Sequence, residues 1–108
     1  MSEYYPDGWV IIELDNKDGK KDHFVFGSWS GGYTQGDSWR TNSGIVRVEE
    51  NDDNQYEIHG HGKSVYYCHK GSEGRISSYN QAVLAELCES SNTKVINFED
   101  MELKNDRD

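Results

Sequence analysis

Apolar and polar residues alternate along several short segments of this chain, and a period of two is typical of half-buried β-strands. Clusters of Asn, Asp, Gly and Lys separate most of these segments, as turns between consecutive strands do. The pattern therefore predicts an antiparallel meander or a small half-barrel of about five to six strands. The expected strands are 8–14, 23–26, 45–49, 55–59, 64–69 and 93–98.

The period changes after Gly74. Four apolar residues then recur at the spacing of one helical face, and Ser78 with Gln81 three residues later fits a capping box. We expect one C-terminal helix of about a dozen residues, whose apolar side covers the sheet and whose end lies near Asn92. The fold class predicted is α+β. The four residues of the stripe are Val83, Leu84, Leu87 and Cys88.

The length of 108 residues predicts a single domain over 1–108. Residues 1–7 are expected to form a polar lead-in, and the acidic tail from Glu99 is expected to fray. Neither end carries an apolar run long enough for a membrane span or a signal peptide. We therefore expect a cytoplasmic protein in which Cys68 and Cys88 stay unpaired and buried.

The segment 27–44, GSWSGGYTQGDSWRTNSG, has no aliphatic residue but holds two tryptophans and a tyrosine. Its glycines favour a long loop over a core strand or a helix. Large aromatics among Ser, Gly and Asn are typical of binding loops. We expect a recognition surface with Trp29, Tyr33 and Trp39 as anchors and with Asp37 and Arg40 setting orientation. The alternative is that Trp29 and Trp39 point inward and pin the loop to the core.

Charge narrows the choice of partner. Twenty acidic residues against eleven basic ones give a net charge of −9. Such a chain repels phosphate backbones and anionic lipid surfaces, so we expect neither sequence-independent nucleic-acid binding nor membrane binding. A protein with a basic surface is the natural partner, since opposite charge accelerates encounter. The sequence leaves open whether the chain forms a homo-oligomer.

Two patterns that suggest ligand chemistry do not meet its requirements. The run 60–64, GHGKS, resembles the end of a phosphate-binding loop, but position 57 is Glu and a strand follows instead of a helix. Four potential zinc ligands match no established spacing. We expect no metal, no cofactor and no catalytic residue. The four ligands considered were His59, His61, Cys68 and His69.

The approach to the predicted helix offers a possible anion site. Residues 71–75, GSEGR, lead into the helix start, where free N–H groups together with Arg75, Ser77 and Ser78 can hold a phosphate or carboxylate. The alternative is an ordinary strand-to-helix loop. The acidic runs 49–53 and 99–108 suggest a second and lesser idea, mimicry of DNA phosphates, although nearby lysines dilute their field.

The motifs GSWSGGY at 27–33, GDSWR at 36–40 and NSGI at 42–45 resemble small uncharacterised proteins of large tailed bacteriophages. The resemblance runs from the Trp9 strand to the helix after Arg75. It implies a setting in the infected bacterial cytoplasm, where small acidic phage proteins often bind and redirect host enzymes. It implies no catalytic residues.

The sequence thus favours a non-catalytic protein-binding protein, in the phage setting a modulator or inhibitor of a host bacterial factor. The alternative is a small-molecule or nucleotide-binding protein, or an enzyme acting on such a ligand, that stacks the ligand on the aromatic loop. A deep pocket beneath the loop would favour the ligand, whereas a flat or convex aromatic surface would favour the protein partner.

Overall fold

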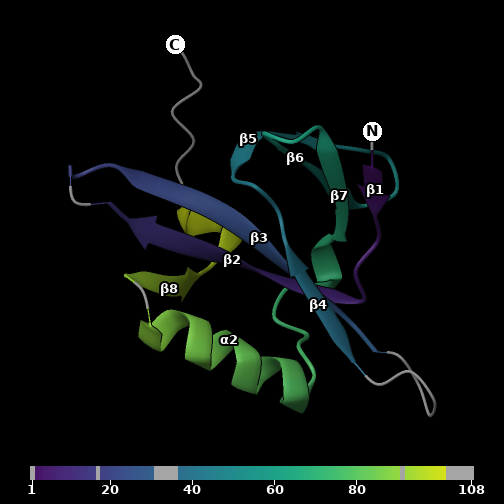
Figure 1. The fold of residues 1–108 in the computed structure, drawn as a ribbon. Coiled ribbons are helices and arrows are strands. Elements are labelled where there is room, and N and C mark those ends of the chain that lie inside the picture. The colour runs from purple at the N-terminus through teal and green to yellow at the C-terminus, as the bar shows by residue number, and fades with distance from the viewer. Residues whose placement is uncertain (1, 17, 31–36, 91, 102–108) are drawn as a thin grey trace.

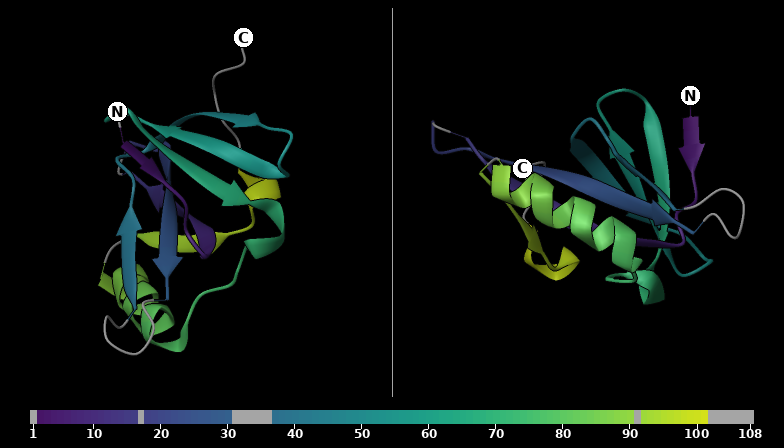
Figure 2. Two further views of the ribbon diagram at one scale, coloured as in Figure 1. Left: turned by 90° about the vertical axis from the view of Figure 1, so that its right-hand side faces the viewer. Right: turned by 60° about the horizontal axis from the view of Figure 1, so that its bottom comes forward.

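Two sheets and one α-helix form three layers in the computed structural model of the chain, which describes residues 2–16, 18–30, 37–90 and 92–101 (Figure 1). The sheet β4-β3-β2-β8 lies in the middle, with α2 on one face and the sheet β1-β7-β6-β5 on the other (Figure 2). The predicted α+β class is confirmed. The strands are β1 Ser2–Tyr4, β2 Gly8–Asp15, β3 Lys21–Trp29, β4 Ser38–Thr41, β5 Ile45–Glu50, β6 Gln55–Gly60, β7 Ser64–His69 and β8 Thr93–Ile96; the helices are α2 Ser78–Ser90 and the short 3₁₀ turns η1 Lys70–Ser72 and η2 Phe98–Asp100.

The number of strands and the half-barrel were predicted wrongly. The described residues form eight strands in two open sheets, and neither sheet closes. β2, β3 and β4 make one antiparallel unit, and β5, β6 and β7 make a second. Each unit then gains one strand distant in sequence, since β8 pairs with β2 and β1 pairs in parallel with β7. Two separate units facing each other replace one continuous meander.

The main core lies between the two sheets. It is built from the inward side chains of β2 and β3 on one side and of β6 and β7 on the other. We call this the inner core: Trp9, Ile11, Val25, Ile58, Tyr66 and Cys68, each at most 1 % exposed.

A second core lies between the middle sheet and α2. There Val10, Ile12 and Phe26 meet Ile76 and Leu84, and the predicted apolar stripe of the helix packs on them. β2 is therefore covered on both faces. Strands of this kind are apolar along their whole length instead of alternating, which explains the unbroken run WVII at 9–12.

The lead-in 1–7 was predicted wrongly, because Ser2–Tyr4 forms strand β1. Its register with β7 places Tyr4 beside Tyr66, and the two ring centroids are 4.8 Å apart. Only one of the three residues of β1 carries a large apolar ring. Such a short and mostly polar strand has no period that the sequence can reveal.

The loop predicted over 27–44 is wrong at both described ends. β3 continues to Trp29, and Ser38–Thr41 forms β4 beside it. Gly27 is buried, and a Cβ there would lie 3.2 Å from both the Pro6 Cβ and the Trp29 ring. This glycine thus lies in a closely packed strand and not in a flexible loop. Residues 31–36 lie outside the described residues.

The helix forms where it was predicted, but its cap is one residue earlier. The Ser77 hydroxyl accepts a hydrogen bond from the Asn80 backbone N–H at 3.2 Å, and the Gln81 side chain donates to the Ile76 carbonyl at 2.8 Å. Ser77, not Ser78, is thus the N-cap.

The remaining predictions for the C-terminal third were correct in part. Both cysteines are free, but Cys88 is only half-buried. The last strand ends at Ile96, and the following residues turn into η2. Glu99 belongs to η2, so the described start of the acidic tail is ordered as a 3₁₀ turn; residues 102–108 lie outside the described residues.

Candidate functional site

Strand β4 carries the most exposed described part of the aromatic segment. It pairs with β3 on one side, and no described strand pairs with its other side. Because successive side chains of a strand point to opposite faces, Trp39 shares the face of α2 and Arg40 shares the face of the other sheet. An edge strand also presents unpaired backbone N–H and C=O groups. β4 therefore combines two large side chains with an edge that no other described strand pairs with.

Trp39 lies flat on Phe26, with ring centroids 5.4 Å apart and an interplanar angle of 8°. Phe26 is fully buried, whereas 40 % of the surface of Trp39 is exposed. One face of the indole is thus fixed by packing while the rest meets water. A rigid, partly covered aromatic ring is the kind of side chain that dominates interface energetics.

The first turn of α2 is tied to the same edge. Asn80 is fully buried, and its Nδ2 donates to the Ser28 hydroxyl and to the Ser38 carbonyl, each at 2.8 Å. The preceding residue, Tyr79, is 62 % exposed. A second exposed aromatic residue therefore belongs to the helical turn that is fixed to β4.

Trp29 is placed differently from Trp39. It is half-buried, its Nε1 donates to the Tyr5 carbonyl at 3.0 Å, and its ring meets the edge of Tyr4 with centroids 6.3 Å apart. Arg40 lies on the same side, with its Cζ 4.8 Å from the centre of the Tyr4 ring. Trp29 therefore corresponds to the alternative in which a tryptophan holds the segment to the core.

Of the other two residues of the expected surface, the structure describes only Asp37. Asp37 is half-buried and makes no ion pair with Arg40 within the described residues, where the partner of Arg40 is the Tyr4 ring. Tyr33 lies outside the described residues. The described recognition candidates are thus reduced to Trp39 and Arg40.

The expected anion site is only loosely assembled. Arg75 and Ser78 are exposed, and Arg75 makes no ion pair within the described part of the chain. The Ser77 hydroxyl accepts a hydrogen bond from the Asn80 N–H, and the Ser77 carbonyl accepts one from the Gln81 N–H. One of the donors that would bind an anion at a helix start is therefore already occupied.

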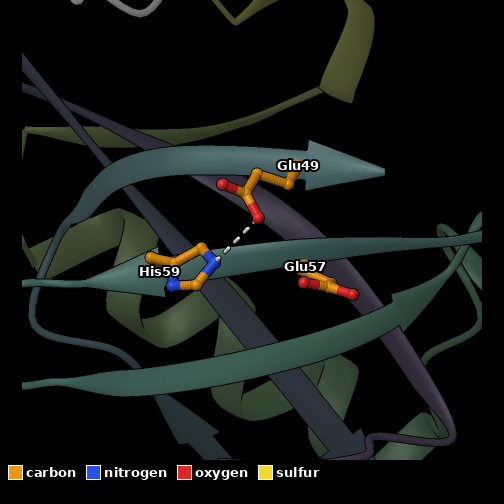
Figure 3. A group of neighbouring side chains, drawn as sticks. All are labelled: Glu49, Glu57 and His59. Atoms are coloured by element: carbon orange, nitrogen blue, oxygen red, sulfur yellow. Dashed lines mark ion pairs between the residues drawn. The ribbon is translucent and has the colours of Figure 1, made fainter. Parts of the chain in front are cut away.

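Three potential metal ligands meet on the outer face of the sheet β1-β7-β6-β5 (Figure 3). Ligand atoms of Glu49, Glu57 and His59 lie within 4.8 Å of one another. Glu49 stands directly opposite Glu57 in the β5–β6 register, and the His59 ring points toward the Glu49 carboxylate at 3.9 Å. A zinc ion would need all three atoms at roughly 2.0–2.2 Å from itself, so the side chains would have to close inward.

The guanidinium group of Arg47 already contacts two of these three residues. Arg47 Nε lies 3.1 Å from a Glu49 oxygen, and Arg47 Nη2 lies 3.3 Å from His59 Nε2. Asn51 Nδ2 donates to Glu57 at 3.2 Å. Arg47 thus supplies a positive charge to Glu49, while Glu57 is held by a neutral amide, so we interpret the group as a cross-strand polar network.

The other three ligands considered from the sequence do not join this group. Cys68 is fully buried in the inner core, and burial alone raises the pKa of its thiol far above the ordinary range. His69 is exposed and His61 lies beyond the end of β6. The sequence placed Cys68 and His69 on opposite faces, and their burial agrees with this.

A buried acid–base pair was not indicated by the sequence reasoning. Glu13 and His23 stand opposite each other on β2 and β3, each is 8 % exposed, and His23 Nε2 lies 3.2 Å from Glu13 Oε2. Lys21 and Lys94 Nζ each lie 3.6 Å from the other Glu13 oxygen. The signal was present, because Glu13 continues the inward face of Trp9 and Ile11.

The surroundings of Glu13 favour its charged form. Burial by itself raises the pKa of Glu13, but the hydrogen bond with His23 and the charges of Lys21 and Lys94 act the other way, and the pKa is lowered overall. The pair borders a polar hollow of about 730 Å³, lined by Glu13, Gly19, Lys20, Lys21, Asp22, His23 and Asp100.

Protonation of Glu13 is expected to make the protein less stable in acid. The stabilising effect of charged Glu13 is fully present above the ordinary pKa of 4.5 and is lost as the pH falls through the lower pKa of the folded state. Urea unfolding at pH values between about 3 and 6 should show that the free energy of unfolding falls more steeply with decreasing pH for the wild type than for Glu13→Gln. The exposed Glu89→Gln should keep the wild-type slope. Equal slopes for the wild type and Glu13→Gln would contradict the assignment.

A second hollow, of about 480 Å³, lies between α2 and β8. Its lining is mainly apolar and includes Val10, Ile76, Leu84, Cys88 and Val95. Neither this hollow nor the one at Glu13 is lined by Trp29, Asp37, Trp39 or Arg40. The aromatic residues of β3 and β4 thus lie beside neither of these two hollows.

No protein family, curated protein or solved structure matches this chain in comparisons with known proteins. Among the described residues, no helix has the length and apolar character needed to cross a membrane.

Proposed function

We propose that this chain is a non-catalytic binding protein that docks on another protein through the edge strand β4. The observation that carries the proposal is the placement of Trp39, which is held flat on Phe26 and is 40 % exposed on an edge strand. A partner strand can pair with such an edge, while Trp39 and Arg40 reach the two faces beside it. Main-chain hydrogen bonds then supply affinity, and the two side chains supply specificity.

Stacking a nucleotide or sugar on the aromatic residues would need a pocket beneath them, and neither of the two hollows described above, at α2–β8 and at Glu13, is lined by Trp39 or Arg40. The resemblance to phage proteins favours a host bacterial protein as the partner. The net charge of −9 favours a partner whose surface is basic.

The proposal is tested by first capturing the partner from bacterial lysate on the immobilised chain and then measuring its affinity for variants. Trp39→Ala should weaken binding by about 2 kcal/mol or more, roughly thirtyfold in Kd, as the loss of an interface anchor does. The fold should persist, because Trp39 is 40 % exposed on an edge strand and lies outside both cores.

The matched control is Val95→Ala, which removes an apolar side chain that is 45 % exposed on β8, the opposite edge strand of the same sheet. It should leave the affinity unchanged. If Trp39→Ala lowered the melting temperature by many degrees while binding stayed the same, Trp39 would be a core residue and the proposal would be wrong.

A further inference from the structure

The outer face of the sheet β1-β7-β6-β5 is turned away from the inner core. Tyr66 and Cys68 point into the inner core, so Val65 and Tyr67 on β7 point to the opposite side, where Val65 is buried and Tyr67 is half-buried. β8 belongs to the middle sheet and α2 lies beyond that sheet, so neither reaches this side (Figures 1 and 2). Many antiparallel sheets leave one face in water, so only the chemistry of this face can indicate a partner.

Two stacked tyrosines stand out on this face. The rings of Tyr5 and Tyr67 are 4.9 Å apart at an interplanar angle of 10°, and Tyr5 is 56 % exposed. Both hydroxyls reach one carboxylate: Tyr5 donates to Glu3 at 3.1 Å, and Tyr67 donates to Glu3 at 3.5 Å. The hydrogen bond with Glu3 raises the pKa of Tyr5, so this phenol stays neutral. Glu3 thus helps to hold two aromatic rings parallel at the surface.

The stack lies between two carboxylates that lack a basic partner. Glu3 comes from β1 on one side, and Glu57 stands opposite Tyr67 on β6 on the other. The nearby Glu49 and Glu50 pair with Arg47 and Lys70. By contrast, within the described residues Glu3 bonds only to the two phenols and Glu57 only to the Asn51 amide.

We propose that this face binds an arginine-rich basic segment of the partner protein, with a guanidinium stacked on Tyr5 and Tyr67 between Glu3 and Glu57. Carboxylates attract the cation, and the exposed ring accepts its flat face, an arrangement that arginine suits better than lysine. The molecule uses the same chemistry internally, where Arg40 lies 4.8 Å over the Tyr4 ring.

This inference rests on the proposed function in one respect, since it names the chemistry of the partner. The two surfaces are linked through the N-terminal segment, because the Tyr4 ring contacts Arg40 of β4 on the inner side and the next residue, Tyr5, belongs to the stack on the outer side.

The test uses hexa-arginine and hexa-lysine peptides as probes, with affinities measured by calorimetry at low salt. Hexa-arginine should bind more tightly than hexa-lysine, and added salt should weaken it. Tyr5→Ala, Glu3→Gln and Glu57→Gln should each weaken hexa-arginine binding by about fivefold, the size of an exposed cation–π or ion-pair contact. Tyr5→Phe keeps the ring and should keep most of the affinity.

The matched control is Glu89→Gln, which removes the same charge from the exposed side of α2. Its effect should be well under twofold. If Glu89→Gln weakened binding as much as Glu3→Gln, or if hexa-lysine bound as tightly as hexa-arginine, only general charge attraction would be left and the site would be refuted. Trp39→Ala should bind hexa-arginine as the wild type does. If the peptide experiment refutes the arginine site, the separate proposal of docking through β4 is therefore still open to its own test.

Discussion

Replacing Trp9 with alanine is expected to lower the free energy of unfolding by about 3–5 kcal/mol, the cost of deleting a large core aromatic. Trp9 is fully buried, and its ring meets the edges of Tyr56 and Phe98 with centroids 5.9 and 6.0 Å away. Its Nε1 also donates to the His69 carbonyl at 2.8 Å. The variant therefore loses apolar packing on several sides and leaves a partly buried carbonyl without its donor.

Urea unfolding followed by circular dichroism measures this effect. Trp9→Phe is the matched control, because it keeps a ring in the cavity and should lose clearly less than Trp9→Ala. Trp9 joins β2 to β7 and to the segment after β8, so a loss below about 1 kcal/mol for Trp9→Ala would mean that the two sheets do not pack as described.

Gly8→Ala is expected to cost about 3 kcal/mol or more, at the upper end of the range for overpacked sites. A Cβ on Gly8 would lie 1.5 Å from the Arg75 carbonyl oxygen and 2.5 Å from its carbon. Both are backbone atoms, so no side-chain rotation relieves the collision. The segment before α2 would have to leave β2, which would break the hydrogen bond from the Gly74 N–H to the Trp9 carbonyl at 2.7 Å.

Gly71→Ala serves as the matched control, since the nearest atoms to a Cβ there belong to the His69 ring at 3.4 and 3.5 Å. It should change stability by no more than about 0.5 kcal/mol. Thermal and urea unfolding of both variants decide the question. Similar small decreases in the free energy of unfolding for Gly8→Ala and Gly71→Ala would show that the segment before α2 does not pack tightly on β2.

The candidate site was predictable only in part. The composition of the segment 27–44 predicts exposed aromatic side chains, and Trp39 is exposed. Which of the two tryptophans stays exposed depended on two residues far away in the sequence: the Tyr4 ring packs against Trp29, and the Tyr5 carbonyl accepts the hydrogen bond of the Trp29 indole. The same holds for the tyrosine stack, because Tyr5 and Tyr67 meet only through the parallel pairing of β1 with β7.

The strands β5, β6 and β7 and the helix α2 can be predicted from the chain alone, because their side chains alternate or recur with a clear period. Strand β2 can be predicted from its unbroken run of apolar and β-branched residues. Hydrophobic burial acts on each of these segments locally, so the pattern is visible in the chain. That β1 and β4 are strands, that two sheets form instead of one, and that Glu13 meets His23 became clear only from the folded structure. These depend on which partner each backbone and side chain finds across the fold. The few polar or glycine-rich residues of β1 and β4 are ordered by neighbouring strands and not by their own periodicity.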